Sequence, residues 1–503
     1  MDFITGHLLS LILFLPIVTA VVVLVLPGDR PQSLRWTAFA GSLIPFGLSL
    51  VLWAQFDLSA PGFQFEEQAN WYTALNASYH LGVDGISLTM VMLSTLLTPL
   101  AILASFNITE KVKAYMALFL MLETGMLGVF FALDLMLFFV FWEVGLIPMY
   151  FLIAQWGGKN RDYASLKFML FTIAGSLGLL LAIQLIGVVS GTFDMPALFE
   201  IWPALTEGML MGLPVATVKS LAFWAFVVAF AVKVPVWPVH TWLPDAHTEA
   251  PTAGSMILAG VLLKLGAYGF LRLILPLYPA EAKQYAVWLA ALGTLSIIFG
   301  ALSAAGQTDF KRLVAYSSIN HMGFVVLGIA AAALAAGTEH AHIAMNGVIL
   351  QMFNHGVSAA GMFFLVGVIY DRTHSRDMRE LGGFWRNAPI YGSVLIFTSM
   401  ASLGLPGLNG FVSEFLVVRG AWPVFTAATA LSTIGLFFTG VYVLKGIRGV
   451  LLGLIKRKWF TLDCEMNTRE LVVIAPLLAL MLVIGFWPMW ILDVINQAVM
   501  MWF

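Results

Sequence analysis

Cysteine and charge are both scarce in this chain, and each shortage excludes a class of protein. Cys464 is the only cysteine among the 503 residues, which excludes an intrachain disulfide and an iron–sulfur cluster held by cysteines of this chain. Charged residues make up 10% of the sequence, whereas soluble domains carry about 25%. Hydrophobic residues make up 60%, so the composition predicts an all-α polytopic membrane protein.

Signals for nucleotide and nucleic-acid binding are missing as well. Neither GxGxxG nor GxxxxGK[ST] occurs in the sequence, so we expect no nucleotide cofactor on this chain. The formal net charge of −2 offers no attraction for a nucleic acid, and the expected surroundings are a lipid bilayer. The first apolar run, residues 8–26, follows no basic segment. It is interpreted as a retained membrane helix rather than a cleaved signal.

Apolar segments divide the chain into fourteen predicted membrane spans, most of them near the ~20 residues that cross a bilayer. Spans seven and twelve are interrupted, by Pro235 and Pro238 and by the glycines and proline of 404–410. The spans are predicted at about 7–27, 35–56, 82–106, 113–131, 135–155, 164–189, 219–244, 254–275, 285–304, 312–334, 343–369, 390–418, 423–447 and 470–492.

Basic residues sort the loops between these spans onto two sides. Of the 25 lysines and arginines, four lie at the loops of one side and two lie inside spans, which leaves nineteen at the opposite loops. Because basic loops stay in the cytoplasm, both termini are predicted on the non-cytoplasmic side of a plasma membrane. The four are Lys219, Arg272, Lys283 and Arg419, and the two inside spans are Lys233 and Lys264.

An internal repeat is also predicted. Spans four to eight and nine to thirteen form two groups of five, and the interrupted span is the fourth of each group. An odd number of spans inverts the second copy, and paired broken helices point to a transport site. Chance placement of glycine and proline is the alternative. The predicted organisation is a three-helix segment at 1–107, repeats at 108–283 and 284–455, and a C-terminal loop and helix at 456–503.

Ionisable residues inside the predicted spans are the candidate functional residues. Several lie about 15 Å deep, counted at 1.5 Å per residue from the span ends. Acids, lysines and histidines at one depth are typical of a proton relay, while static ion pairs that hold the bundle together are the alternative. The candidates are Glu123, Glu143, Lys233, Lys264, His321, His355 and Glu414.

The residues that follow Lys233 admit a second interpretation. His240, Asp245, His247 and Glu249 could hold a metal ion, but neither their spacing nor their composition matches a zinc pattern,. Capping and hydrogen bonding at the broken end of span seven is the favoured interpretation, and no metal site is expected.

Long motifs around these residues resemble the antiporter-like subunits of respiratory complex I (NADH:quinone oxidoreductase), and among them the subunit M, or chain 4, family. The resemblance extends over nearly the whole chain. It rests on FWEVGLIPMYFLIAQWGG (141–158), VKVPVWPVHTWLPDAHTEAPT (232–252), LLKLGAYG (262–269), DFKRLVAYSSINHMG (309–323), HGVSAAGMFF (355–364) and GLPGLNGFVSEF (404–415).

The resemblance implies fourteen helices with two inverted five-helix repeats, discontinuous helices seven and twelve, and a proton channel. It implies a relay of Glu143, Lys233, Lys264 and Glu414, with His321, His355, Glu123 and His240 in support. Sister antiporter-like subunits are the implied partners, and NADH, FMN, iron–sulfur clusters and quinone are implied in other subunits. A multisubunit cation/proton antiporter is the alternative, although that group usually carries lysine where this chain has Glu414.

Overall fold

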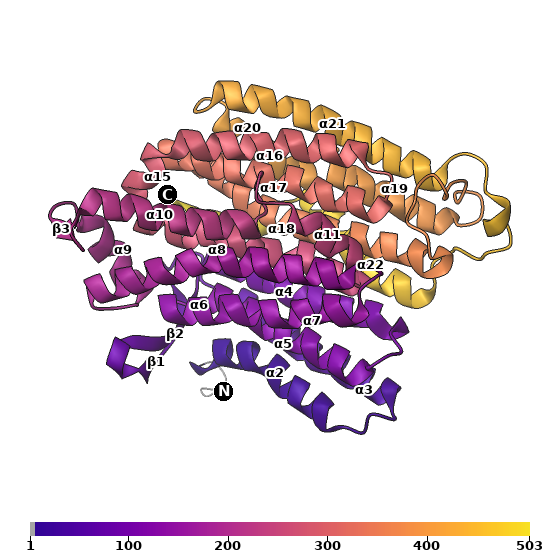
Figure 1. The fold of residues 1–503 in the computed structure, drawn as a ribbon, viewed down its shortest axis with the longest axis horizontal. Helices are drawn as coiled ribbons and strands as arrows, with labels where there is room; N and C mark the ends of the chain where they lie inside the picture. The colour runs from indigo at the N-terminus through magenta and orange to yellow at the C-terminus, as the bar shows by residue number, and fades with distance from the viewer. Residues whose placement is uncertain (1–5) are drawn as a thin grey trace.

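The computed structural model describes residues 6–503 as an elongated bundle of membrane-spanning helices (Figure 1). Within that range thirteen helices are long and apolar enough to cross a membrane. They are α2 (Leu8–Val25), α3 (Pro31–Gln55), α4 (Gly85–Ala104), α5 (Val112–Phe131), α6 (Leu135–Val144) with α7 (Leu146–Trp156), α8 (Arg161–Ser190), α10 (Val215–Lys233), the run Thr252–Leu277, α16 (Ala286–Gly306), α17 (Phe310–Leu334), α18 (Glu339–Thr373), α21 (Thr426–Leu451) and α22 (Thr468–Phe486).

A broken pair supplies the fourteenth predicted span. α19 (Pro389–Leu403) is followed by Gly404, which adopts φ +81°, and α20 runs from Asn409 to Ala421. The other predicted break is also present, because α10 ends at Lys233 and α11 (Trp242–Glu249) begins nine residues later. The expected number of spans and both interruptions are therefore confirmed.

Two irregular segments of the bundle were not predicted. The fifth span is divided at Gly145, between α6 and α7 and two residues after Glu143. The eighth span runs from α12 (Thr252–Ile257) to α14 (Leu275–Leu277). It contains two π-helical segments, Leu258–Leu262 and Phe270–Ile274, on either side of α13 (Leu263–Gly269). π-Helical segments inside α-helices often occur at functional sites, and here they flank the helix that carries Lys264.

The centre of the bundle is formed by the eighth span and α18, both buried throughout their apolar windows. Glycines let these two helices approach closely: a Cβ on Gly356 would lie 2.8 Å from the carbonyl oxygen of Gly260. Small residues permit such close packing between membrane helices. The approach places His355, the residue before Gly356, beside the helix of Lys264.

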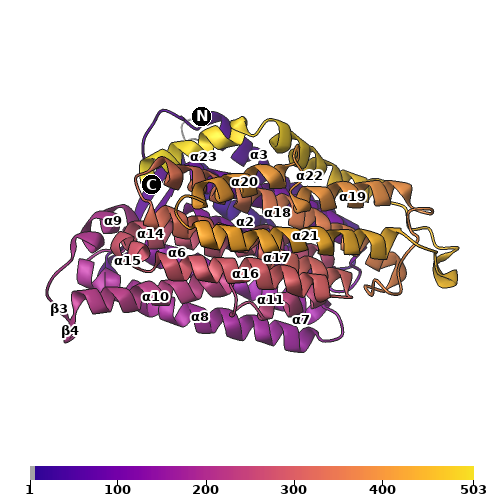
Figure 2. The same ribbon diagram turned by 90° about the horizontal axis from the view of Figure 1, so that it is seen from above.

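Small elements cover the two ends of the bundle. One end, which we call the hairpin end, carries β1 (Gln64–Tyr72), antiparallel β2 (Ala77–Val83), α9 (Met195–Ala204), the short strands β3 (Met209–Leu210) and β4 (Leu213–Pro214), and α15 (Pro279–Gln284). The opposite end, which we call the basic end, carries the long loops 374–388 and 452–467 (Figures 1 and 2).

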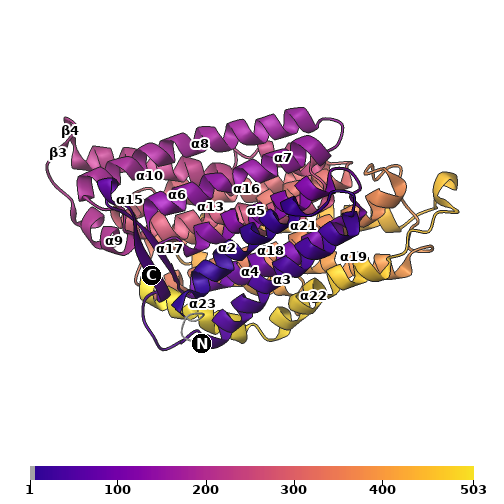
Figure 3. The same ribbon diagram turned by 90° about the horizontal axis from the view of Figure 1, so that it is seen from below.

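The last predicted span needs a correction. The prediction was one helix over 470–492, but α22 ends at Phe486 and a separate helix, α23 (Met489–Trp502), follows it. Pro488 lies between them, and a proline cannot continue the hydrogen-bonding pattern of the preceding helix. Figure 3 shows α23 near β1 and β2, at the same end as the C-terminus.

Candidate functional site

Lys264 and His355 are joined by a direct hydrogen bond in the centre of the bundle. The ammonium of Lys264 lies 2.7 Å from Nδ1 of His355, and both side chains are buried. The ammonium also donates to the carbonyl oxygen of Ala259, in the first π-helical segment. With Lys264 protonated, its ammonium can only donate, so Nδ1 of His355 accepts and the proton of the neutral ring resides on Nε2.

Histidines continue this contact toward α20. The rings of His355 and His321 have centroids 5.7 Å apart, and Nδ1 of His321 lies 2.7 Å from the carboxylate of Glu414. Because a carboxylate only accepts, Nδ1 of His321 carries a proton. Four buried ionisable side chains from four helices thus form one row, Lys264–His355–His321–Glu414, which we call the continuous row.

Neutral polar groups hold the far end of the continuous row. The amide of Gln351 donates to Glu414 at 3.0 Å, and the hydroxyl of Ser413 donates to the other end of that amide at 2.5 Å. The Tyr442 hydroxyl lies 3.2 Å from Nε2 of His321. These contacts fix the carboxylate and the ring in place, and the cavity beside them has a volume of only about 10 Å³.

Glu143 and Lys233 are arranged differently. The ammonium of Lys233 lies 5.0 Å from the centroid of the Trp142 ring, and Glu143 is the carboxylate whose charge acts on it. In the part of the chain that the structure describes, the Lys233 ammonium and Oε1 of Glu143 have no hydrogen-bond partner. No ion pair within 4 Å joins them there, so we call them the separated pair.

The separated pair lies against the helix that begins the continuous row. A Cβ on Gly266, two residues after Lys264, would lie 2.8 Å from the carbonyl oxygen of Phe230 and 3.0 Å from Cβ of Lys233. The eighth span therefore packs directly on the broken end of α10. Among residues 6–503, no hydrogen bond links the separated pair to Lys264.

The two supporting residues Glu123 and His240 lie outside these contacts. Glu123 is fully buried on α5, with Thr98 of α4 as its polar neighbour. His240 lies in the break of the seventh span, half-buried, with its ring 6.4 Å from that of Tyr316. The structure brings neither of them into the continuous row.

His247 is a buried histidine whose surroundings the sequence prediction missed. Capping and hydrogen bonding were predicted for it, but its ring is fully buried and stacked on Phe363 at 4.3 Å. Within the described chain neither ring nitrogen has a hydrogen-bond partner, so that prediction is wrong for this residue. Lys311 and Lys264 are the cations whose charges act on the ring. Its burial on a short helix depends on tertiary packing and leaves no local signal.

The other two members of that group bind residues of α8, of α17 and of the turn before α8. Asp245 pairs with Lys167 at 2.7 Å and faces Arg312 at 3.5 Å. Glu249 accepts from the backbone N–H of Asn160 at 3.0 Å. The predicted hydrogen bonding is confirmed for these two carboxylates, whereas Thr241, the N-cap of α11, makes no side-chain capping bond.

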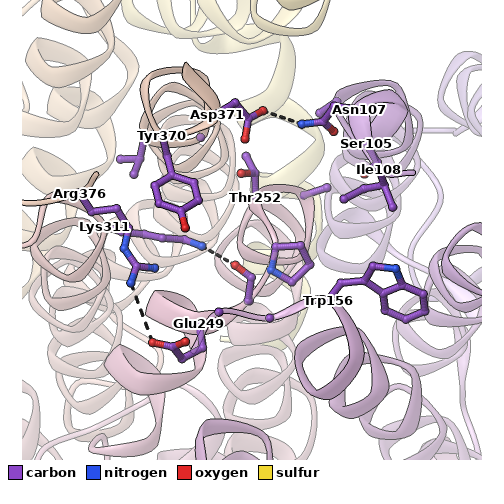
Figure 4. A pocket seen from close by; sticks show the side chains of 18 of the residues that line it. Ser105, Asn107, Ile108, Trp156, Glu249, Thr252, Lys311, Tyr370, Asp371 and Arg376 are labelled. Atoms are coloured by element: carbon purple, nitrogen blue, oxygen red, sulfur yellow. Dashed lines mark hydrogen bonds and ion pairs between the residues drawn. The ribbon is translucent and has the colours of Figure 1, made fainter. Parts of the chain in front are cut away.

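A polar cavity of about 190 Å³ opens at the basic end next to Lys311 (Figure 4). The Lys311 ammonium donates to the carbonyl oxygen of Ala250. Arg376 faces Glu249 at 3.9 Å, and on the other side the amide of Asn107 donates to Asp371 at 2.6 Å. Both signs of charge therefore line this cavity.

Known proteins are similar to this chain in sequence over nearly its whole length. The family described as "NADH:quinone oxidoreductase/Mrp antiporter, TM" matches residues 132–444, and "NADH-ubiquinone oxidoreductase chain 4, amino terminus" matches residues 34–132. NADH-quinone oxidoreductase subunit M of Rhodobacter capsulatus is 42% identical, with 98% of this chain and 96% of the relative covered. The subunit M of Escherichia coli K12 is 41% identical, with 92% and 91% covered.

Solved structures show the same fold. A chain of respiratory complex I from Thermus thermophilus superposes with a TM-score of 0.85 at 28% identity, over 98% of both chains. A chain of the Mrp complex from Dietzia sp. DQ12-45-1b superposes with a TM-score of 0.81 at 24% identity, over 98% of this chain and 52% of that one. The second likeness concerns the fold alone.

Proposed function

We propose a function for this chain, which belongs to the NADH-quinone oxidoreductase subunit M family. It is a proton-translocating subunit in the membrane arm of an NADH:quinone oxidoreductase. Its partners are sister antiporter-like subunits. NADH, FMN, iron–sulfur clusters and quinone belong to other subunits, so the redox chemistry takes place outside this chain and supplies its driving energy.

The continuous row is the observation that carries this proposal. Buried ionisable groups are costly inside a membrane and mark ion or proton pathways. Here a lysine, two histidines and a glutamate, each from a different helix, lie in one row, with a 2.7 Å hydrogen bond at each end of the row. Histidine can accept a proton on one ring nitrogen and release another. The row therefore supports stepwise proton movement from Lys264 to Glu414.

The separated pair is the proposed control point. When the carboxylate of Glu143 approaches Lys233, it stabilises the charged ammonium; when the two part, Lys233 loses its counter-ion and releases its proton toward Lys264. Moving one elementary charge against 100 mV requires about 2.3 kcal/mol, which quinone reduction in the partner subunits supplies. Glu123 and His240 are proposed to support this step electrostatically.

The polar cavity of Figure 4 is the proposed proton inlet. From there Lys311 and His247 lead toward Lys264, and Glu414 supplies the exit. The basic end faces the cytoplasm of a prokaryote in this proposal, because basic loops are retained there. Both termini then lie on the outer side of the plasma membrane.

The inverted repeat remains part of the proposal. Repeats at 108–283 and 284–455, between a segment at 1–107 and a terminal part at 456–503, place one break in each copy. The breaks after Lys233 and Leu403 support that pairing.

Replacing Lys233 tests this function. We expect Lys233→Ala to abolish proton pumping in membrane vesicles energised with NADH, because the releasing group is gone, while the complex still assembles. Lys283→Ala removes an exposed lysine at the hairpin end and is the matched control. A normal number of protons pumped per NADH in Lys233→Ala would exclude the relay.

A cation/proton antiporter is the second candidate function, favoured by the matched family description, which names both NADH:quinone oxidoreductase and the Mrp antiporter. Pumping that requires sodium and continues without NADH oxidation would support it. Pumping that stops when NADH oxidation is inhibited supports the redox-driven subunit.

A further inference from the structure

A cavity at the basic end of α21 lies outside the relay. It has a volume of about 470 Å³, and Lys445 and Arg448 of α21, Thr308, Arg379 and Leu454 are among the residues that line it. Two loops, 374–388 and 452–467, meet α21 at this point, and α21 itself runs along the outer edge of the bundle (Figures 1 and 2).

The cavity carries positive charge that the protein does not neutralise. Arg379 is held by Asp377 at 2.7 Å, so that pair is nearly neutral. The Lys445 ammonium donates to the carbonyl oxygen of Ala305 at 2.7 Å, which leaves further N–H groups and a full charge. Within residues 6–503, the exposed guanidinium of Arg448 has no side-chain hydrogen bond or ion pair.

An apolar stripe on α21 ends at this charge. Ile434, Phe437, Val441 and Leu444 are exposed at helical spacing, and Phe437 is 69% and Leu444 58% exposed. Residues three and four apart share a helix face, so the next position of the stripe is Arg448. An exposed apolar face that ends in a basic residue fits an acyl chain beneath an anionic head group.

We propose that this cavity binds an anionic phospholipid of the leaflet at the basic end. The phosphate lies between Arg448 and Lys445, the Thr308 hydroxyl donates to it, and an acyl chain follows the α21 stripe. Leu454, 94% exposed at the rim of the cavity, reaches into the same leaflet. A free phosphate ion would satisfy the charges but would leave the stripe and Leu454 without a ligand.

Site-specific photo-crosslinking tests the proposal independently of proton pumping. A photoreactive amino acid in place of Leu454, in the intact complex in phosphatidylglycerol-containing nanodiscs, is expected to form an adduct with phosphatidylglycerol, identified by peptide mass. Each basic group near a membrane surface contributes about a fivefold gain in lipid binding. The adduct yield should therefore fall about fivefold in Arg448→Gln and about 25-fold in the double variant with Lys445→Gln.

Two controls separate lipid from other occupants. Arg30→Gln removes an exposed arginine directly before α3, which lies on the opposite edge of the bundle from α21 (Figure 1), and should leave the yield unchanged. Inorganic phosphate should not compete, and phosphatidylcholine should give a lower yield. Equal yields in Arg448→Gln and the parent, full competition by phosphate, or an adduct with a neighbouring subunit in place of lipid would each overturn the proposal. Native gels report assembly of every variant.

Discussion

The continuous row and the separated pair use the same kinds of side chain in opposite ways. In the row, Lys264 and Glu414 each have a histidine partner at 2.7 Å. In the pair, the Lys233 ammonium faces an aromatic ring, and Glu143 lies beyond ion-pair distance. Buried charges with good partners are held firmly, whereas a buried charge without one is costly and easily displaced. The comparison suggests that the row conducts protons and the pair controls when they are released.

The largest expected effect comes from breaking the row at Lys264 while keeping its charge. Arginine stays protonated in proteins, so Lys264→Arg retains a cation but cannot release a proton. We expect pumping to fall by about 100-fold or more, the scale of removing a general acid–base group. Pumping per NADH in vesicles measures it.

A static role for Lys264 would give a different result. If the lysine only holds the helices together, the guanidinium replaces it as a hydrogen-bond donor and pumping stays near the parent value. Lys264→Met, which removes the charge as well, is the companion variant. It should lose proton pumping whether Lys264 carries protons or only holds the helices together.

A smaller effect is expected from moving the two helices of the row apart. In Gly356→Ala the new Cβ would lie 2.6 Å from Leu93 and 2.8 Å from the carbonyl oxygen of Gly260. Overpacking of this kind costs about 1–3 kcal/mol, and we expect the Lys264–His355 contact to lengthen. Thermal unfolding and pumping should both decline. Gly440→Ala is the matched control, because its nearest contact would be 3.9 Å. Unchanged pumping in Gly356→Ala would contradict a need for that close contact.

The smallest expected effect concerns a histidine outside the membrane spans, which sharpens the comparison because its protonation is accessible to solution measurements. His80 of β2 lies 2.6 Å from Asp194 and 3.0 Å from Glu66, one carboxylate at each ring nitrogen. Two carboxylates that accept at both nitrogens require an imidazolium. Burial lowers the pKa of His80, but the hydrogen bonds and charges of Asp194 and Glu66 outweigh it and the net direction is upward.

The sign of the pH dependence follows from that raised pKa. The contribution of His80 to stability is fully present below its unfolded pKa of about 6.5 and is lost as pH rises through the folded value. Hydrogen exchange of the amides in β2, corrected for the intrinsic rate, should therefore speed up toward alkaline pH. His80→Asn should remove this dependence, and persistence of the dependence in that variant would assign it to another group.

Local sequence signals predicted the spans, the breaks and the individual charged residues. A proline such as Pro235, or a group of glycines such as that in 404–410, interrupts an apolar segment by its own local chemistry. A lysine such as Lys264 is easily recognised among apolar neighbours. Their partners were not predictable. The contact of Lys264 with His355 joins residues 91 positions apart, and it depends on the close approach of two glycines.

Other features had no readable signal at all. The first π-helical segment beside Lys264 arises in a run of ordinary apolar residues, and the second differs only by Arg272. The stacking of His247 on Phe363 depends on packing between distant helices. The division of the span at Gly145 could not be predicted from the sequence either, since glycine is common in unbroken membrane helices.

The most direct test of the relay is the number of protons pumped per NADH in Glu414→Gln. The glutamine keeps the shape of the side chain and can still accept from Nδ1 of His321, but it cannot take up a proton. In vesicles of the assembled complex, we predict that this ratio falls below that of the parent complex. A ratio equal to the parent's, at an equal rate of NADH oxidation, would show that protons do not pass through Glu414 and would contradict the relay.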